Sequence, residues 1–147
     1  MNRLAAICVF ALVLGCWASA SMADPGRGAS VQCYVWANES TNPGPYTPST
    51  PYSYNATGRA AANSISRSAV GTYQVTCKGV GGGALFSGSG SWGAGGHVQV
   101  TAYGSEDADF CKVVNWGTGG ADFTANVRCY NRSGNLSDNR FDLLFLW

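Results

Sequence analysis

Few side chains in this chain could carry proton-transfer chemistry. Its single histidine, His97, stands between glycine and valine at the start of an alternating stretch. A histidine that acts as a general base needs a carboxylate to orient it and a nucleophile within hydrogen-bond reach. No motif around His97 supplies either group. We therefore interpret His97 as a surface residue and expect no catalytic residues and no enzyme activity.

A short acidic cluster, formed by Glu106, Asp107 and Asp109, is the one candidate for metal binding. Calcium needs oxygen ligands that converge from one loop at defined spacings. These three acids lack that spacing, so a solvated turn is favoured over a calcium site. The sequence predicts no bound metal.

One glycine motif has the form used by dinucleotide-binding proteins. Gly88, Gly90 and Gly93 match G-x-G-x-x-G. That motif binds a pyrophosphate only where it follows a strand and opens a helix within a βαβ unit. Here a strand is expected to follow instead of a helix, so we predict no nucleotide and no other cofactor.

Aromatic side chains are the richer source of recognition chemistry. Their faces stack on sugar rings, while amides and carboxylates bond the hydroxyls. The alternative is that they pair across strands and close the ends of the fold. That structural role is favoured for Trp36 and Trp116, whereas the two roles are equally supported for aromatics in glycine- and proline-rich loops. The candidate binding residues are therefore Trp92, Tyr46, Tyr52 and Tyr54, with a carbohydrate or another cell-surface component as the expected partner.

The first 23 residues predict export. Arg3 provides a positive start, residues 4–14 an apolar core, and residues 18–23 small-residue cleavage signals. The segment is too short for a stable membrane span. We place cleavage after Ala23, which leaves residues 24–147 as a single secreted domain. The alternative is a lipid anchor at Cys16, within a lipobox-like sequence that fits less well.

The charge balance excludes two classes of partner. The chain has nine basic and eight acidic residues, and loss of Arg3 leaves eight of each. Nucleic acids and anionic membranes bind to basic patches. No such patch is present in residues 24–147, so we expect neither partner.

The cysteines predict two disulfides. Six are present, and Cys8 and Cys16 leave with the leader. An even number in an exported chain indicates disulfides, and zinc is disfavoured because no pair has C-x-x-C spacing.

We expect Cys111 to pair with Cys129, since both lie on the apolar rows of neighbouring strands. A tight turn would place Cys111 opposite Asn126 or Val127, so this pairing requires a wider loop or a bulge. Cys33 and Cys77 then remain, and each lies on the apolar row of its own strand, so we expect them to pair.

Alternation of period two predicts strands along most of the domain. We expect them at residues 31–37, 52–55, 60–67, 71–77, 98–103, 123–129 and 140–147, with one more around Cys111. Residues 96–130 read as three consecutive strands around which the rest is organised. Seven or eight short strands without a helical period predict an antiparallel β-sandwich, with a barrel as the alternative.

The motifs GHVQVTAYGS, FCKVVNWG and VRCYNRSG, with the closing FDLLFLW, resemble a repeat unit of secreted bacterial proteins of unknown function. Those units typically read G-N-V-Q-V-T-A-Y-G, C-K-V-x-x-W and V-N-V-R-C-F. The upstream segments YVWAN, YTPSTPYSYN and GTYQVT are also similar, so the resemblance covers nearly the whole domain. It implies a bacterial source and a repeat architecture, and it brings no catalytic residues.

Two functional classes remain. The first is a non-catalytic extracellular module that binds a surface component or acts as a spacer. The alternative is a small secreted hydrolase or an enzyme inhibitor. A hydrolase needs two carboxylates, or a nucleophile and a base, in one cleft; an inhibitor needs a rigid exposed loop, for which the proline-rich segment is a candidate.

Overall fold

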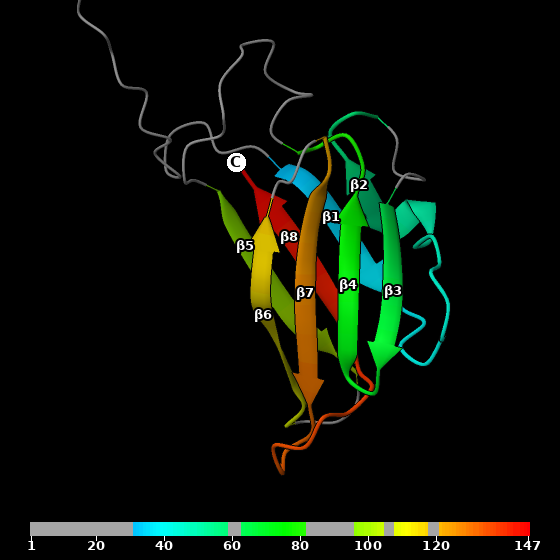
Figure 1. Ribbon diagram of the computed structural model, residues 1–147, viewed down its shortest axis with the longest axis vertical. Helices are drawn as coiled ribbons and strands as arrows, with labels where there is room; N and C mark the ends of the chain where they lie inside the picture. The colour runs from blue at the N-terminus through cyan, green and yellow to red at the C-terminus, as the bar shows by residue number, and fades with distance from the viewer. Residues whose placement is uncertain (1–30, 59–62, 82–95, 105–107, 118–120) are drawn as a thin grey trace, which may run out of the picture.

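Two four-stranded antiparallel sheets pack face to face (Figure 1). The computed structural model describes residues 31–58, 63–81, 96–104, 108–117 and 121–147. The first sheet has the strand order β2-β1-β8-β5 and the second β3-β4-β7-β6. The predicted antiparallel sandwich is confirmed, with eight strands in the described residues.

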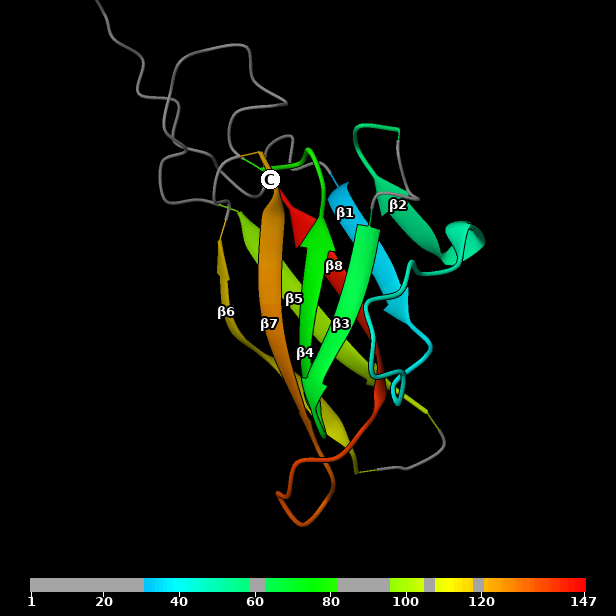
Figure 2. The same ribbon diagram turned by 45° about the vertical axis from the view of Figure 1, so that its right-hand side comes forward.

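The strand boundaries lie close to those predicted. The strands are β1 (Val31–Ala37), β2 (Ser53–Asn55), β3 (Asn63–Ala69), β4 (Thr72–Cys77), β5 (His97–Tyr103), β6 (Phe110–Gly117), β7 (Phe123–Tyr130) and β8 (Arg140–Leu146). A single 3-10 turn, η1 (Thr50–Tyr52), precedes β2. The proline-rich segment between β1 and η1 runs beside β3 (Figure 2). No helix in the described residues is long and apolar enough to cross a membrane.

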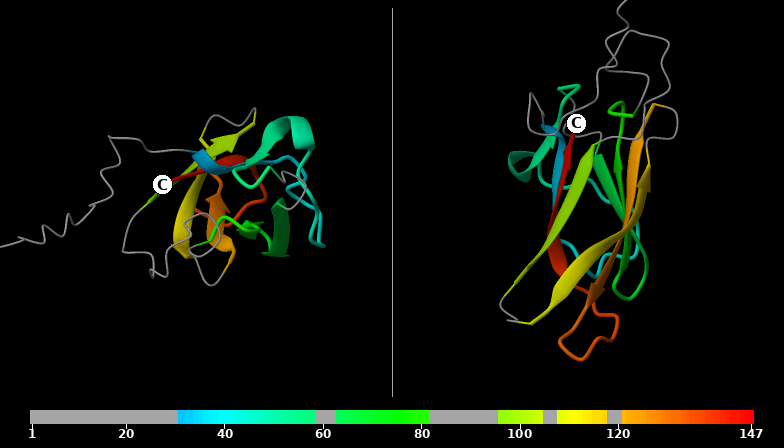
Figure 3. Two further views of the ribbon diagram at one scale, coloured as in Figure 1. Left: turned by 90° about the horizontal axis from the view of Figure 1, so that it is seen from above. Right: turned by 90° about the vertical axis from the view of Figure 1, so that its left-hand side faces the viewer.

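The core lies between the two layers, which the edge-on view separates (Figure 3). Alternate residues of the four central strands point inward and are almost completely buried; they are Cys33, Val35 and Ala37, Tyr73, Val75 and Cys77, Phe123, Ala125, Val127 and Cys129, and Phe141, Leu143 and Phe145. Phe123 stacks on Phe145 across the layers, with 4.2 Å between ring centroids. This burial of every second residue is what the period of two requires.

Residues 96–130 do form three strands, but these strands do not share one sheet. β5 pairs with β8 in the first sheet, whereas β6 pairs with β7 in the second. β5 and β6 are edge strands that lie close together on one side of the sandwich (Figure 3). The stretch therefore bridges both layers and does not form one central sheet.

Both predicted disulfides are present. Cys33 of β1 bonds Cys77 of β4, so this bridge joins the two sheets, with 6.3 Å between the Cα atoms. Cys111 bonds Cys129, which lies directly opposite it in the β6–β7 ladder. The ladder starts with Gly117 opposite Thr124, which is a wider connection than a tight turn, and its register shifts by one residue between Val113 and Asn115. The pairing therefore uses both the wider loop and the bulge that were predicted as alternatives.

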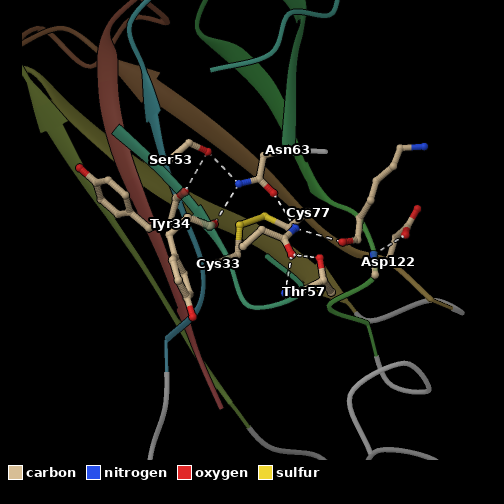
Figure 4. The surroundings of a disulfide bond; sticks show 11 residues. Cys33, Tyr34, Ser53, Thr57, Asn63, Cys77 and Asp122 are labelled. Carbon is tan, nitrogen blue, oxygen red and sulfur yellow. Dashed lines mark hydrogen bonds between the residues drawn. A yellow bond between two sulfur atoms is a disulfide. The ribbon is translucent and has the colours of Figure 1, made fainter. Parts of the chain in front are cut away.

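A pair of buried asparagines joins the two sheets at one edge of the sandwich, beside the inter-sheet disulfide (Figure 4). Asn55 and Asn63 are 1% and 0% exposed. The Asn55 amide donates to the Asn63 side-chain oxygen at 2.8 Å, and the Asn63 amide donates to Ser53 Oγ at 2.8 Å and to the Tyr54 carbonyl at 2.9 Å. Buried amides destabilise a fold unless they are bonded. These bonds satisfy them and tie β2 of the first sheet to β3 of the second.

A second polar network surrounds Asp138, which precedes β8. Its carboxylate accepts hydrogen bonds from Arg67 Nε at 2.9 Å and Nη2 at 2.8 Å, and from the Gly71 N–H at 2.8 Å. The Tyr73 hydroxyl lies 2.9 Å from the same carboxylate and 3.0 Å from the Ser40 carbonyl. The bonds from Arg67, above all, hold the pKa of Asp138 below its ordinary value.

Loss of the inter-sheet disulfide should destabilise the domain more than loss of the cross-strand one. The two bridges span sequence separations of 44 and 18 residues. In the chain-entropy model these loops correspond to about 4 and about 3 kcal/mol. Cys33 and Cys77 are both fully buried, whereas in the second pair Cys129 is fully buried and Cys111 only partly, so the first replacement leaves two serine hydroxyls without water and the second leaves one. Thermal unfolding of the Cys33→Ser/Cys77→Ser and Cys111→Ser/Cys129→Ser variants measures the difference; an equal or reversed order contradicts it.

Asp138→Asn should destabilise the protein at neutral pH by about 2–3 kcal/mol, since it removes a charged acceptor of several hydrogen bonds. A lowered folded pKa means that the carboxylate stabilises fully above the unfolded pKa of about 4, and that this contribution is lost as the pH falls through the folded pKa. The variant should therefore lose less stability than wild type on acidification below about pH 4. Chemical unfolding across that range tests this, with Asp109→Asn as a carboxylate control. Equal acid sensitivity of Asp138→Asn and wild type rejects the prediction.

Candidate functional site

The outer face of the first sheet carries a small hollow lined mainly by aromatic side chains. β1 contributes Tyr34 and Trp36, η1 contributes Tyr52, β5 contributes Tyr103 and β8 contributes Asp142. These five residues surround about 240 Å³, and we call the site the aromatic hollow. Trp36 stands opposite Asp142 in the β1–β8 ladder, and residues directly opposite each other present their side chains on the same face of a sheet.

The rings of the hollow stand nearly at right angles. Trp36 and Tyr52 have centroids 4.8 Å apart and planes inclined by 75°. Trp36 and Tyr103 have centroids 5.8 Å apart and planes inclined by 88°. Because β8 separates β1 from β5, the backbones of these two strands lie about 10 Å apart, so both rings lean over β8. Tyr52 and Tyr103 are each 54% exposed, which leaves ring surface open to a ligand.

The polar part of the hollow is a carboxylate held by a tyrosine. The Tyr34 hydroxyl donates to Asp142 Oδ1 at 2.9 Å. Burial, and then this hydrogen bond, raises the pKa of Tyr34, so the hydroxyl stays protonated at neutral pH and acts as a donor. Among the described residues, Asp142 forms no ion pair; the ion pair found there joins Arg67 and Asp138. The Asp142 carboxylate therefore keeps acceptor capacity for a ligand.

The residues that the sequence suggested for binding lie in different parts of the structure. Tyr52 lines the hollow. Tyr54 lies opposite Tyr34 in the β1–β2 ladder and is 49% exposed, so it extends the aromatic row to the edge of the sheet. Trp92 lies outside the described residues.

Tyr46 has a different environment from the other tyrosines. Its backbone forms a bridge with Ile65 of β3, through N–H···O bonds of 2.8 and 2.9 Å. Its hydroxyl accepts a hydrogen bond from the Glu39 N–H at 3.3 Å, and its ring packs against the core. Burial raises the pKa of Tyr46 to about 12. These contacts hold the proline-rich segment against β3, away from the aromatic hollow.

The one histidine, which was weighed for proton transfer, lies away from the hollow. His97 pairs with Leu146, four residues along β8 from Asp142, which corresponds to about 13 Å. Glu106, Asp107 and the glycine motif at residues 88–93 lie outside the described residues, and Asp109 is half-buried. In the part of the chain that the structure describes, no three His, Cys, Asp or Glu side chains form a group that could hold a metal.

Sequence reasoning assigned Trp36 a structural role and did not single out Asp142. Two features of the sequence do point to Trp36 and Asp142. Alternation places Tyr34 and Trp36 on the row opposite Cys33, and Asp142 is the one acidic residue in the apolar closing run FDLLFLW. Neither signal says that these two strands are neighbours.

A scan against protein-family models and searches of curated proteins and of solved structures gave no match to this chain.

Tyr46→Ala should lower the stability of the fold far more than Tyr52→Ala. The first change removes a ring packed against the core, which costs about 3 kcal/mol or more when a cavity is left. The second removes a ring that is 54% exposed, which should cost under about 1 kcal/mol. Thermal unfolding of both variants measures the difference. The opposite order would show that Tyr46 is not the anchor of the proline-rich segment.

Proposed function

We propose that this protein is an exported binding module that acts without catalysis and that the aromatic hollow is its ligand site. The observation that carries the proposal is the convergence of four aromatic side chains and one carboxylate from β1, η1, β5 and β8. Exposed aromatic rings around a hollow with a few polar groups are typical of recognition sites. Tyr52 and Tyr103 are each 54% exposed. Burying these rings would stabilise the fold, so their exposure is better explained by ligand binding than by stability.

Export is supported by the leader and the two disulfides. Residues 1–23 have the pattern of a secretory signal. Disulfides form and persist in oxidising compartments, and the Cys33–Cys77 bridge joins the two sheets. A spacer role would need the fold alone, whereas the open aromatic hollow favours binding.

The chemistry of the hollow favours binding over hydrolysis. Asp142 is the one carboxylate among its lining residues. Glycoside hydrolysis uses two carboxyl groups, and acyl transfer needs a nucleophile with a base. Burial, and then the bond to Asp142, raises the pKa of Tyr34, which keeps its hydroxyl protonated and disfavours it as a nucleophile. The tyrosine instead orients the carboxylate.

The size of the hollow limits how large a group of a ligand can bind in it. Its volume of about 240 Å³ is below the range of about 300–1,000 Å³ that is usual for sites of drug-sized molecules. We infer that it accepts one headgroup or one residue of a larger molecule. A component displayed on a cell surface presents its groups in this way.

Trp36→Ala and Tyr103→Ala should each weaken binding to the surface component about tenfold or more, as expected for aromatic anchors at the centre of a site. The measurement is binding of the labelled, oxidised protein to glycan and lipid arrays and to intact bacterial cells. Phe110→Ala is the matched control, because Phe110 is 47% exposed and stacks on Tyr130 of the second sheet.

A parallel hydrolase screen should show no turnover that depends on Asp142. Turnover that Asp142→Ala abolishes, or equal loss of binding in Phe110→Ala and Trp36→Ala, contradicts the proposal. The first result would identify an enzyme, and the second would place the binding surface elsewhere.

A further inference from the structure

Ring orientation in the aromatic hollow distinguishes between classes of ligand. A sugar stacks on an open, flat ring face. In this hollow the planes of Tyr52 and Tyr103 are inclined by 75° and 88° to that of Trp36. These are edge contacts, so the rings form walls that meet at an angle, and such walls fit a compact group better than a flat one.

The charge of the hollow points in the same direction. Its lining residues are Tyr34, Trp36, Tyr52, Tyr103 and Asp142, so its formal charge is that of one carboxylate. Arg140 lies on the same strand as Asp142, opposite Tyr103, yet no ion pair within 4.0 Å joins the two side chains. The Asp142 carboxylate, which accepts a hydrogen bond from Tyr34 at Oδ1, thus keeps its charge and its second oxygen for a ligand of opposite charge.

We propose that the aromatic hollow binds a methylated ammonium group, of which the trimethylammonium end of choline is the simplest example. This inference rests on the proposed binding function. The negative faces of aromatic rings attract such a cation, and rings that enclose it form the cages known to recognise quaternary ammonium groups. Asp142 adds a direct Coulomb attraction, and the methyl groups bury apolar surface against the rings. A neutral sugar would gain nothing from the carboxylate charge.

The test compares two ligands of the same shape that differ in charge. Choline and its neutral isostere 3,3-dimethyl-1-butanol are titrated into the oxidised protein, with neutral monosaccharides alongside. Shifts of the Trp36 indole N–H resonance, assigned by its loss in Trp36→Phe, report binding at the site. Choline should bind about tenfold more tightly than the isostere, from the cation–π and carboxylate contributions. Its affinity should fall as salt is added, while that of the isostere stays unchanged.

Two variants separate the charge from the shape of the site. Asp142→Asn should weaken choline binding about tenfold and leave binding of the isostere unchanged, because it removes the charge and keeps the size of the side chain. Asp109→Asn removes a carboxylate outside the hollow and should change neither affinity. Circular dichroism of each variant checks the fold. Should Asp142→Asn fail to fold, the comparison of choline with its isostere on the wild-type protein decides the question.

Each outcome bears on one proposal. Equal affinity for choline and the isostere, no response to choline, or full choline affinity in Asp142→Asn overturns the ammonium inference. Monosaccharide binding that depends on Trp36, without choline binding, overturns it too but leaves the binding function standing. The proposed function itself is tested separately: it fails if binding to cells and arrays does not depend on Trp36 and Tyr103, or if the protein shows turnover that Asp142→Ala abolishes.

Discussion

β1 and β8 pair antiparallel along their length, with Val35 opposite Leu143 and Ala37 opposite Phe141. The inward rows of both strands are almost completely buried. A slip of one residue would turn these rows to solvent and the outward rows into the core, so the register is strongly constrained. That same register sets Trp36 opposite Asp142 on the outer face. The core therefore decides the composition of the aromatic hollow.

Different interactions hold the sandwich together on its two sides. On the β2–β3 side, the inter-sheet disulfide and the bonded pair Asn55–Asn63 join the layers. On the β5–β6 side, residues alternate between exposed and half-buried along β5 and along β6 as far as its register shift, and Trp116, itself 39% exposed, lies over the rim of the core. The register shift in β6 places it opposite the buried Ala125, and its ring lies 6.2 Å from that of Phe123 and 5.9 Å from that of Phe145. One side thus depends on directional polar bonds and a covalent bridge, and the other on ring packing.

The position of the hollow on paired strands has a consequence for binding. Tyr34, Trp36, Tyr103 and Asp142 belong to strands of one hydrogen-bonded sheet. Side chains on such a scaffold lose less conformational freedom on binding than side chains on a free loop. The loop tyrosine Tyr46, by contrast, is occupied in attaching the proline-rich segment to β3. In the proposed function, recognition therefore relies on side chains of the sheet more than on the proline-rich segment.

The amino-acid sequence by itself determined the strands, the sandwich class and both disulfide pairs, because these follow from local alternation and from four cysteines on apolar rows. Alternation also placed Tyr34 and Trp36 on the row opposite Cys33. It did not distinguish the role of Tyr46 from that of Tyr52, and it did not divide β5 and β6 between two sheets. Only the tertiary structure brought Asp142 beside Trp36, from the opposite end of the chain. Local pattern decides which face of a strand is buried, but the choice of neighbouring strands depends on how all the buried rows pack together.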